Sequence, residues 1–285
     1  MKRIFLGAVL AALAVSSASS FADIVTYYVG VDGRSTPFNA PGSLGGGAYP
    51  DNPNQGRLTL LLHHGDHYHG IGAWTYSGPA ATPVLNDTNA NNMLPEGFTG
   101  LPAVRLAKGT GNFADKYRSG LPSSLPQNTE YGNFELRNAH SLVGEDDTTF
   151  NSSGGRWNGT FVDADIWLEL ISATSGLNIA FGDMPTMDLT AGNKYALGAG
   201  DAMFAVKPTF WVDGGAAAGT YTAEFRLRDM NNASRDSGRF FVNLAVVPEP
   251  GGVGLAALGS IVFGAAAWRR SRRRGTLTAP QHSVA

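Results

Sequence analysis

The chain contains no cysteine among its 285 residues. It can therefore form no disulfide bond, and it has neither thiolate metal ligands nor a cysteine nucleophile. Its stability must come from the burial of apolar side chains, which a chain of this length can achieve. Long amphipathic stretches with helical periodicity are also missing, whereas glycine is abundant, with 37 residues. These features favour an all-β fold of many short strands and turns.

Basic residues are scarce in the central part of the chain. Of the 21 lysines and arginines, two precede residue 23 and five follow residue 250, which leaves 14 basic against 23 acidic residues and a net charge near −9. Nucleic acids and anionic lipids attract basic surfaces, so we expect neither as a partner. A divalent cation suits this charge better.

Residues 1–22 have the pattern of a secretory signal peptide. Lys2 and Arg3 precede an apolar run over residues 4–15, the small residues 16–20 follow, and Ser20 and Ala22 are small residues at the positions that signal peptidase recognises. The apolar run is too short to span a membrane, as is typical of signal peptides. We therefore expect export, with cleavage by signal peptidase after Ala22.

The C-terminal part predicts a membrane span. Residues 251–268 carry no charge, and five arginines follow within residues 269–274. Eighteen helical residues cover most of the hydrocarbon core of a membrane, so this run predicts a transmembrane helix. The arginines favour the cytoplasmic side for the tail 275–285, which leaves the domain before the helix outside the inner membrane.

The residues Pro248, Glu249 and Pro250 precede this helix. A Pro-Glu-Pro motif, an uncharged helix and a terminal arginine cluster, here within residues 247–274, resemble the PEP-CTERM sorting signal of exopolysaccharide-producing Gram-negative bacteria. The resemblance covers roughly the last 40 residues. It implies cleavage near the motif by an exosortase and delivery to the cell surface or the extracellular matrix, where the exopolysaccharide would be a partner.

Histidine is concentrated in one short segment. Four of the six histidines lie within residues 63–69, where they flank Gly65 and Asp66. Residues 57–62 and 70–76 on either side are rich in apolar residues and predict two β-strands. Glycine is the residue favoured at the first central position of a type II′ turn. The segment therefore predicts a β-hairpin with Gly65 and Asp66 as its loop.

Such a hairpin would gather three imidazoles. His64 would lie directly opposite His67, and His69 would share their face because side chains alternate along a strand. His63 and Tyr68 would point to the other side. Opposed Cβ atoms lie about 5 Å apart, so the three imidazoles of one face could bind one ion.

Zinc is the ion that we expect at this cluster. Imidazole suits zinc, copper and nickel, and zinc commonly takes a tetrahedral set of ligands. The fourth ligand could be His140, the carboxylate of Asp66, or water. A longer loop or a bulge would regroup the histidines and could bring in His63. The alternative is that these histidines are solvated or hydrogen-bonded without any metal.

Three segments resemble a narrower group of proteins. They are residues 64–72, 219–227 and 237–242, and they are similar to segments of the Zur-repressed PEP-CTERM proteins. That group is named for repression by the zinc-uptake regulator, which implies production under zinc starvation. The resemblance supplies no catalytic residues.

The segment between the termini predicts one secreted domain over residues 23–246. We expect an antiparallel β-sandwich of the jelly-roll or immunoglobulin-like type. Residues 77–125 are expected to be irregular and could cover the metal face. The expected strands, including the two of the hairpin, are residues 23–31, 57–62, 70–76, 129–143, 159–173, 177–181, 203–212, 219–228 and 238–247.

Acidic residues offer two weaker candidate sites. Residues 145–147 could hold calcium, although the spaced pattern of a calcium loop is missing. Asp163, Asp165 and Glu169 fall on one face of an expected strand, where two carboxylates could act on a glycan. A polar face turned toward water explains the same pattern and is preferred.

The sequence therefore favours a surface-associated zinc-binding protein that captures or buffers scarce metal, and not an enzyme. The first alternative is a structural or glycan-binding sandwich without a metal. It would use exposed aromatic residues, for which the candidates are Trp74, Tyr76, Trp157 and Trp167. The second is a zinc hydrolase, since three histidines and a water also form a catalytic site. A hydrolase needs a general base, and only Asp66 lies nearby in the sequence.

Overall fold

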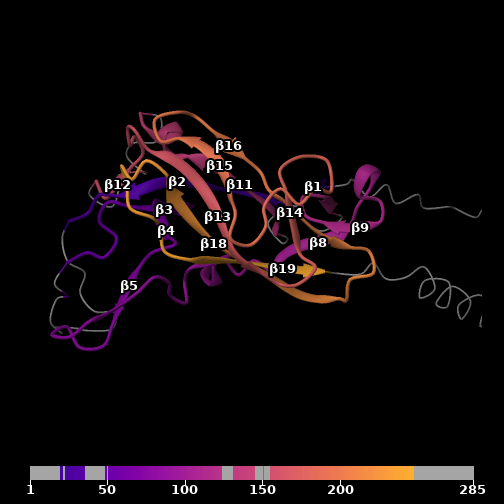
Figure 1. The fold of residues 1–285 in the computed structure, drawn as a ribbon, viewed down its shortest axis with the longest axis horizontal. Helices are drawn as coiled ribbons and strands as arrows, with labels where there is room; N and C mark the ends of the chain where they lie inside the picture. The colour runs from indigo at the N-terminus through magenta and orange to yellow at the C-terminus, as the bar shows by residue number, and fades with distance from the viewer. Residues whose placement is uncertain are drawn as a thin grey trace, which may run out of the picture. The chain divides into compact units, whose positions relative to one another are not determined.

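The computed structural model describes residues 20–21, 23–35, 49, 51–123, 131–144, 150 and 155–246 (Figure 1). The expected transmembrane helix at 251–268, the sorting motif, most of the expected signal peptide and the acidic residues 145–147 lie outside this part. Within it, no helix is long and apolar enough to cross a membrane.

The described elements are β-strands and three short 3-10 helices, which confirms the prediction of an all-β protein. The 3-10 helices are η1 (Gly97–Thr99), η2 (Gly111–Phe113) and η3 (Ala139–Leu142). Two small sheets join β1 (Ser20–Phe21) with β10 (Pro122–Ser123) and β5 (Thr75–Ser77) with β6 (Val84–Asn86).

A six-stranded sheet contains the histidine hairpin at one edge. Its order is β16-β11-β2-β3-β4, and β12 also pairs with β2. The bounds are β16 (Ala205–Val206), β11 (Tyr131–Asn138), β2 (Asp23–Asp32), β3 (Arg57–His64), β4 (His67–Ile71) and β12 (Trp157–Asn158).

A nine-stranded sheet forms the other large layer. Its order is β14-β17-β9-β8-β19-β18-β13-β15, and β7 also pairs with β19. The bounds are β14 (Asn178–Ala180), β17 (Thr209–Asp213), β9 (Lys116–Arg118), β8 (Val104–Lys108), β19 (Phe240–Val246), β18 (Gly219–Asp229), β13 (Asp165–Ala173), β15 (Lys194–Ala199) and β7 (Met93–Leu94).

Both large sheets contribute to one core. Leu58 and Leu60 of β3 belong to the same buried cluster as Phe225 and Leu227 of β18. Each pair is separated by two positions, as expected for one face of a strand. Leu61 points to the opposite side of β3, where it joins a smaller cluster with Tyr68, Ala139, Leu142, Phe150 and Trp157. The six-stranded sheet therefore has apolar contacts on both faces.

The expectation of purely antiparallel sheets is wrong in part. β11 pairs with β2 in parallel, and β19 pairs in parallel with both β7 and β8. Antiparallel neighbours can be joined by a tight turn, whereas parallel pairs need a long connection. These partners lie far apart in the sequence, so local turn signals could not reveal their direction.

Residues 77–125 contain more structure than the sequence suggested. The expectation of an irregular segment fails at β8 and β9, which pair with each other and extend the nine-stranded sheet. Val104 and Leu106 of β8 are fully buried. The five residues of β8 include Arg105 and Lys108, and so short a segment gives no clear strand pattern in sequence, which explains the error. The strand β15 was missed for a similar reason.

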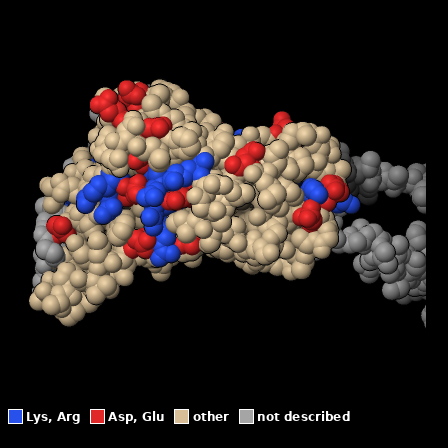
Figure 2. Space-filling model, viewed as in Figure 1, with Lys and Arg blue, Asp and Glu red and all other residues tan. Residues whose placement is uncertain are grey.

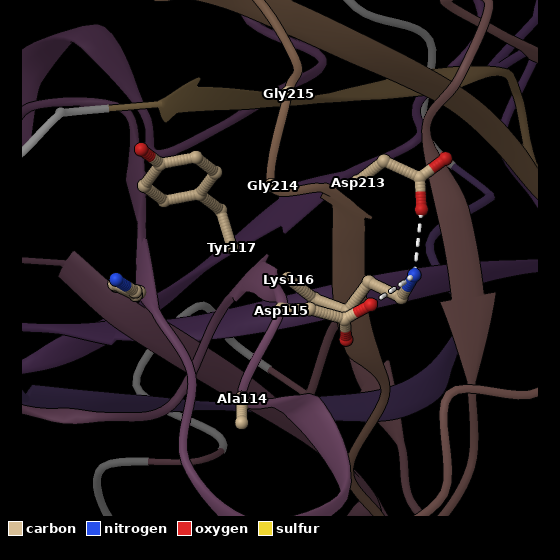
Figure 3. Close-up of a pocket in the computed structure, with 8 residues that line it drawn as sticks. Ala114, Asp115, Lys116, Tyr117, Asp213, Gly214 and Gly215 are labelled. Atoms are coloured by element: carbon tan, nitrogen blue, oxygen red, sulfur yellow. Dashed lines mark hydrogen bonds and ion pairs between the residues drawn. The ribbon is translucent and has the colours of Figure 1, made fainter.

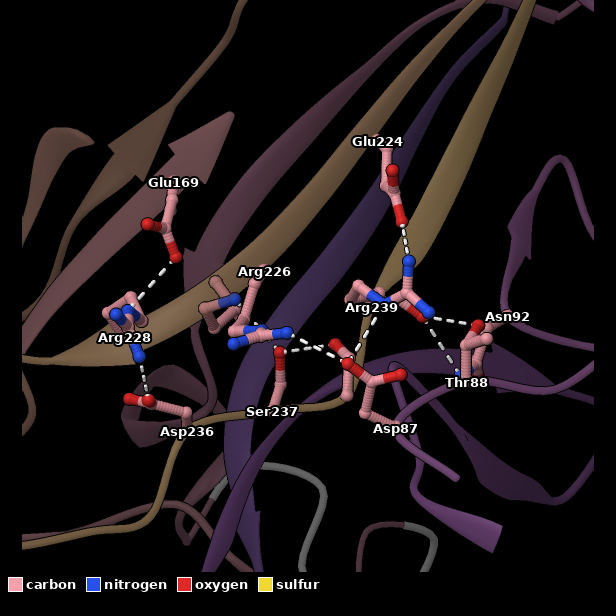
Figure 4. A network of polar contacts seen from close by, with 12 residues as sticks. Asp87, Thr88, Asn92, Glu169, Glu224, Arg226, Arg228, Asp236, Ser237 and Arg239 are labelled. Carbon is pink, nitrogen blue, oxygen red and sulfur yellow. Dashed lines mark hydrogen bonds and ion pairs between the residues drawn. The ribbon is translucent and has the colours of Figure 1, made fainter. Parts of the chain in front are cut away.

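Ion pairs connect the segment before η1 to the nine-stranded sheet (Figure 4). Oδ2 of Asp87 lies 2.9 Å from a guanidinium nitrogen of Arg226 and 2.9 Å from one of Arg239. Arg239 also reaches Glu224, and Arg228 reaches Glu169 at 3.0 Å. Figure 2 shows basic and acidic side chains intermixed in a band across this face. The arginines thus have acidic partners and do not form a purely basic surface.

A buried carboxyl group lies under the segment that carries η1. Glu96 is 3% exposed, and its Oε2 accepts a hydrogen bond from the Tyr27 hydroxyl, which in turn accepts one from Tyr131. Its other oxygen is buried and has no hydrogen-bond partner among the described residues. Burial therefore raises the pKa of Glu96 to about 7, because a charged carboxylate would be poorly solvated there.

The substitution Glu96→Gln should remove a loss of stability that occurs as the pH rises from about 4.5 to about 7. The unfolded carboxyl ionises near its ordinary pKa of 4.5, whereas the folded one keeps its proton up to about pH 7. Stability from this group is therefore complete below the unfolded pKa and decreases by roughly 3 kcal/mol as the pH rises through the folded pKa. Urea unfolding at about pH 4 and at about pH 8 measures this loss, which should be smaller in the glutamine variant. Equal losses in the two proteins would contradict the assignment.

Candidate metal centre

The strands β3 and β4 form the hairpin that the sequence predicts. His64 pairs with His67, His63 with Tyr68, and Leu62 with His69, which confirms the two-residue loop. Gly65 has a φ of 63°, and the loop's second residue does not have a positive φ. A positive φ at the first central position alone matches the type II′ turn and not the type I′ turn.

Three imidazoles meet on one face of this hairpin. One ligand atom from each of His64, His67 and His69 lies within 4.8 Å of the others. The ring centroids are 5.9 Å apart for His64 and His67, 5.2 Å for His64 and His69, and 4.5 Å for His67 and His69. Ligand atoms of a tetrahedral zinc site lie about 3.3 Å apart. Small side-chain rotations would therefore bring the three nitrogens around one ion.

The position of this group follows from the pattern of β3. Leu58, Leu60 and Leu62 face the main core, and His64 is the next residue on the same face. The leucines are buried, whereas His64 is exposed because the strand extends past the core at this end. The histidines thus continue an apolar face at the point where it reaches solvent.

His63 takes no part in the group. Its ring stacks on Tyr68 on the opposite face, with centroids 5.0 Å apart and an interplanar angle of 28°. The bulge or longer loop that would have brought His63 to the metal face is not present, since the register is regular up to the turn. His63 therefore lies on the side of the smaller apolar cluster.

Asp66 lies beside the group, where it contacts an imidazole. Its Oδ1 is 2.9 Å from Nδ1 of His67, and its side chain is 99% exposed. The hydrogen bond from His67 is the main reason that the pKa of Asp66 is lowered. A carboxylate that accepts the Nδ1 proton leaves Nε2 free for a metal. Asp66 is thus better placed to orient His67 than to serve as the fourth ligand.

His140 is separate from the three histidines. It lies in η3, where its backbone N–H donates to Oδ1 of Asn138 and its Nδ1 is 2.9 Å from the Thr160 hydroxyl. The expected strand ends at Asn138, so His140 is not on a strand as the sequence suggested. Among the described residues, His140 does not join the group that could hold an ion.

Phe98 is a member of the site that sequence analysis missed. Its ring centroid lies 4.8 Å from that of His64 and 4.9 Å from that of His69. It is part of η1, within the segment that, from the sequence, could cover the metal face. Nothing in the local sequence distinguishes Phe98 from other loop aromatics, because its contact depends on how a distant segment packs.

The environment of His69 favours the uncharged form of its imidazole. Burial lowers the pKa of His69, and the neighbouring His67 and His64 lower it further because like charges repel. A metal binds the neutral form of imidazole. His69 therefore keeps its ligand form to a more acidic pH than an ordinary histidine.

Side chains of the other candidate sites are paired with other residues or buried. Glu169 pairs with Arg228, and Asp163 lies before β13 with a φ of 66°, so the expected acidic face is incomplete. Trp157 is only 4% exposed, which corrects its proposed role as an exposed glycan-binding residue. The guanidinium of Arg57 lies 4.2 Å above the ring of Trp74, another glycan-binding candidate, and covers one face of it.

A cavity of about 570 Å³ lies between β9 and the turn after β17 (Figure 3). Its central cation, Lys116, lies 2.7 Å from Asp213 and 3.3 Å from Asp115. The hydrogen bond to Asp213 is the main reason that the pKa of Lys116 is raised. Lys116 and these two carboxylates thus neutralise one another.

No family model, curated protein or solved structure matches this chain. The functional interpretation therefore depends on the geometry of the histidine hairpin.

The substitution Gly65→Val should destabilise the protein by about 1 to 2 kcal/mol, because an L side chain is strained at positive φ. The position offers open space, so the cost would come from the backbone and not from a clash. Gly215→Val is the matched control, since Gly215 also has open space but no positive φ. Urea unfolding in metal-free buffer measures both variants. Similar costs at the two positions would contradict the assigned turn.

Proposed function

We propose that this protein is an exported zinc-binding protein that captures or buffers scarce zinc outside the cell. The group formed by His64, His67 and His69 is the observation that carries this proposal. One ligand atom from each imidazole lies within 4.8 Å of the others, so only small side-chain rotations are needed to bind one ion. The cost of organising the ligands is therefore largely met by folding.

The donor set favours zinc. It contains three imidazole nitrogens, and the chain has no cysteine that could supply a soft thiolate. Imidazole also binds copper and nickel, but zinc accepts tetrahedral geometry without a preference imposed by d electrons. The hydrogen bond from His67 to Asp66 resembles the carboxylate contact that commonly supports a zinc-bound histidine.

The location of the protein is proposed from its termini. The signal peptide pattern at residues 1–22 supports export, and the motif Pro248-Glu249-Pro250 with the segments after it supports processing by an exosortase. The protein would then reside at the cell surface or in the extracellular matrix. Production under zinc scarcity, as the resemblance to Zur-repressed proteins implies, would fit a role in zinc capture.

The finer fold type is also proposed. Two large sheets that share one core suit a β-sandwich, and a jelly-roll arrangement accommodates its long connections better than an immunoglobulin-like one. Such a fold would hold the hairpin rigidly at the rim of the core.

The two alternative functions have less support. A glycan-binding protein would need exposed aromatic residues, and Trp157 is buried. A zinc hydrolase would need a general base beside the metal, but the Asp66 carboxylate contacts the imidazole of His67. The glycan-binding alternative does not account for three histidines on one face.

Isothermal titration of the full-length chain with zinc tests the proposal. We expect one zinc ion per chain at neutral pH with micromolar or tighter affinity, about −8 kcal/mol or better. The combined substitution of His64, His67 and His69 by alanine should abolish this binding. His63→Ala is the matched control on the opposite face of the hairpin and should bind as wild type does.

Affinity in the same titration should decrease below roughly pH 6, because protons then compete with zinc for the imidazoles. Unchanged binding in the triple variant would show that the ion is held elsewhere.

A further inference from the structure

The histidine group supplies three of the ligands of a tetrahedral ion. Among the described residues, no further histidine or carboxylate belongs to this group. The carboxylate of Asp66 contacts His67, and the ring of His140 contacts Thr160. The fourth position is therefore available to a donor from outside the site.

This fourth position can be reached from solvent. The hairpin forms the edge of the six-stranded sheet, since β4 is the last strand in the order. At its tip, a side chain added to Gly65 would meet nothing within 4 Å, and the Asp66 side chain is 99% exposed. A large molecule could therefore approach the histidines without a rearrangement of the sheet.

The three imidazoles are not held equally. The ring of Phe98 packs against both His64 and His69, and it covers the site from that side. His67 is held instead by its hydrogen bond to the fully exposed Asp66. The Phe98 ring thus leaves His67 uncovered, and an incoming donor could reach this ligand first.

We infer that this site transfers its zinc ion directly to an acceptor that carries nitrogen or oxygen donors, through the open fourth position. The inference rests on the proposed zinc binding and adds a transfer activity to it. A donor atom of the acceptor first forms a bond to zinc with its own lone pair. His67 then leaves with its lone pair as neutral imidazole, and His69 and His64 follow as further acceptor atoms bind. The oxidation state of zinc does not change, and the ion carries its two positive charges to the acceptor.

Direct transfer and spontaneous release differ in their dependence on the acceptor. If the acceptor must bind before zinc leaves, the transfer rate increases in proportion to the acceptor concentration. If zinc first dissociates into water, the rate equals the dissociation rate and is independent of the acceptor. The kinetics therefore distinguish the two routes without knowledge of the natural acceptor.

The experiment mixes the zinc-loaded, full-length chain with excess pyridylazo-resorcinol, a chelator whose absorbance changes on binding zinc. Stopped-flow traces over a roughly tenfold range of chelator should give rates that increase about tenfold. A rate that stays constant over this range would overturn the inference. Zinc binding is confirmed by titration of the same sample, so a failure of the proposed function would be recognised separately as an absence of binding.

Two variants test the direction of approach. Phe98→Ala should raise the second-order rate constant severalfold, because it uncovers the side of His64 and His69. Val84→Ala is the matched control, since Val84 is also an exposed apolar residue but lies in the separate β5–β6 sheet. Equal rate constants in the two variants would overturn the shielding role of Phe98. Circular dichroism of each variant verifies that the fold is retained.

Discussion

The two-residue turn at Gly65 and Asp66 is the constraint on which the metal centre depends. It fixes the pairing of His64 with His67, and alternation along β4 then places His69 on the same face. A slip of one residue would send each imidazole of one strand to the other side of the sheet. The conformation of a single glycine thus determines whether the three histidines can share an ion.

The core of the protein supports this turn in two ways. The leucines that precede His64 on its face are buried between the large sheets, which prevents the hairpin from changing its register. On the opposite face, Gly70 leaves room for Trp157, because a Cβ there would lie 2.8 Å from the indole ring. Apolar contacts on both sides therefore hold β3 and β4, while their tip extends into solvent. A rigid base with an exposed tip suits a site that must bind an ion and remain accessible.

The sequence predicted features that depend on neighbouring residues and missed those that depend on distant ones. The hairpin register was predictable because a two-residue loop and strand alternation are local properties. The terminal strands β18 and β19 were predictable for the same reason, and they pair as expected. The parallel pairing of β2 with β11, the burial of β8 and the contact of Phe98 with the histidines join segments that are far apart. Their partners are selected by packing of the whole core, which no local pattern encodes.

X-ray absorption spectroscopy of the zinc-loaded protein tests the central claim most directly. Zinc bound by His64, His67 and His69 should show about three imidazole nitrogens at roughly 2.0 to 2.1 Å, with one further nitrogen or oxygen atom. Multiple scattering from the rings identifies imidazole and distinguishes it from carboxylate or water. A first shell with one imidazole or none would contradict the claim that the hairpin gathers these three side chains around one ion.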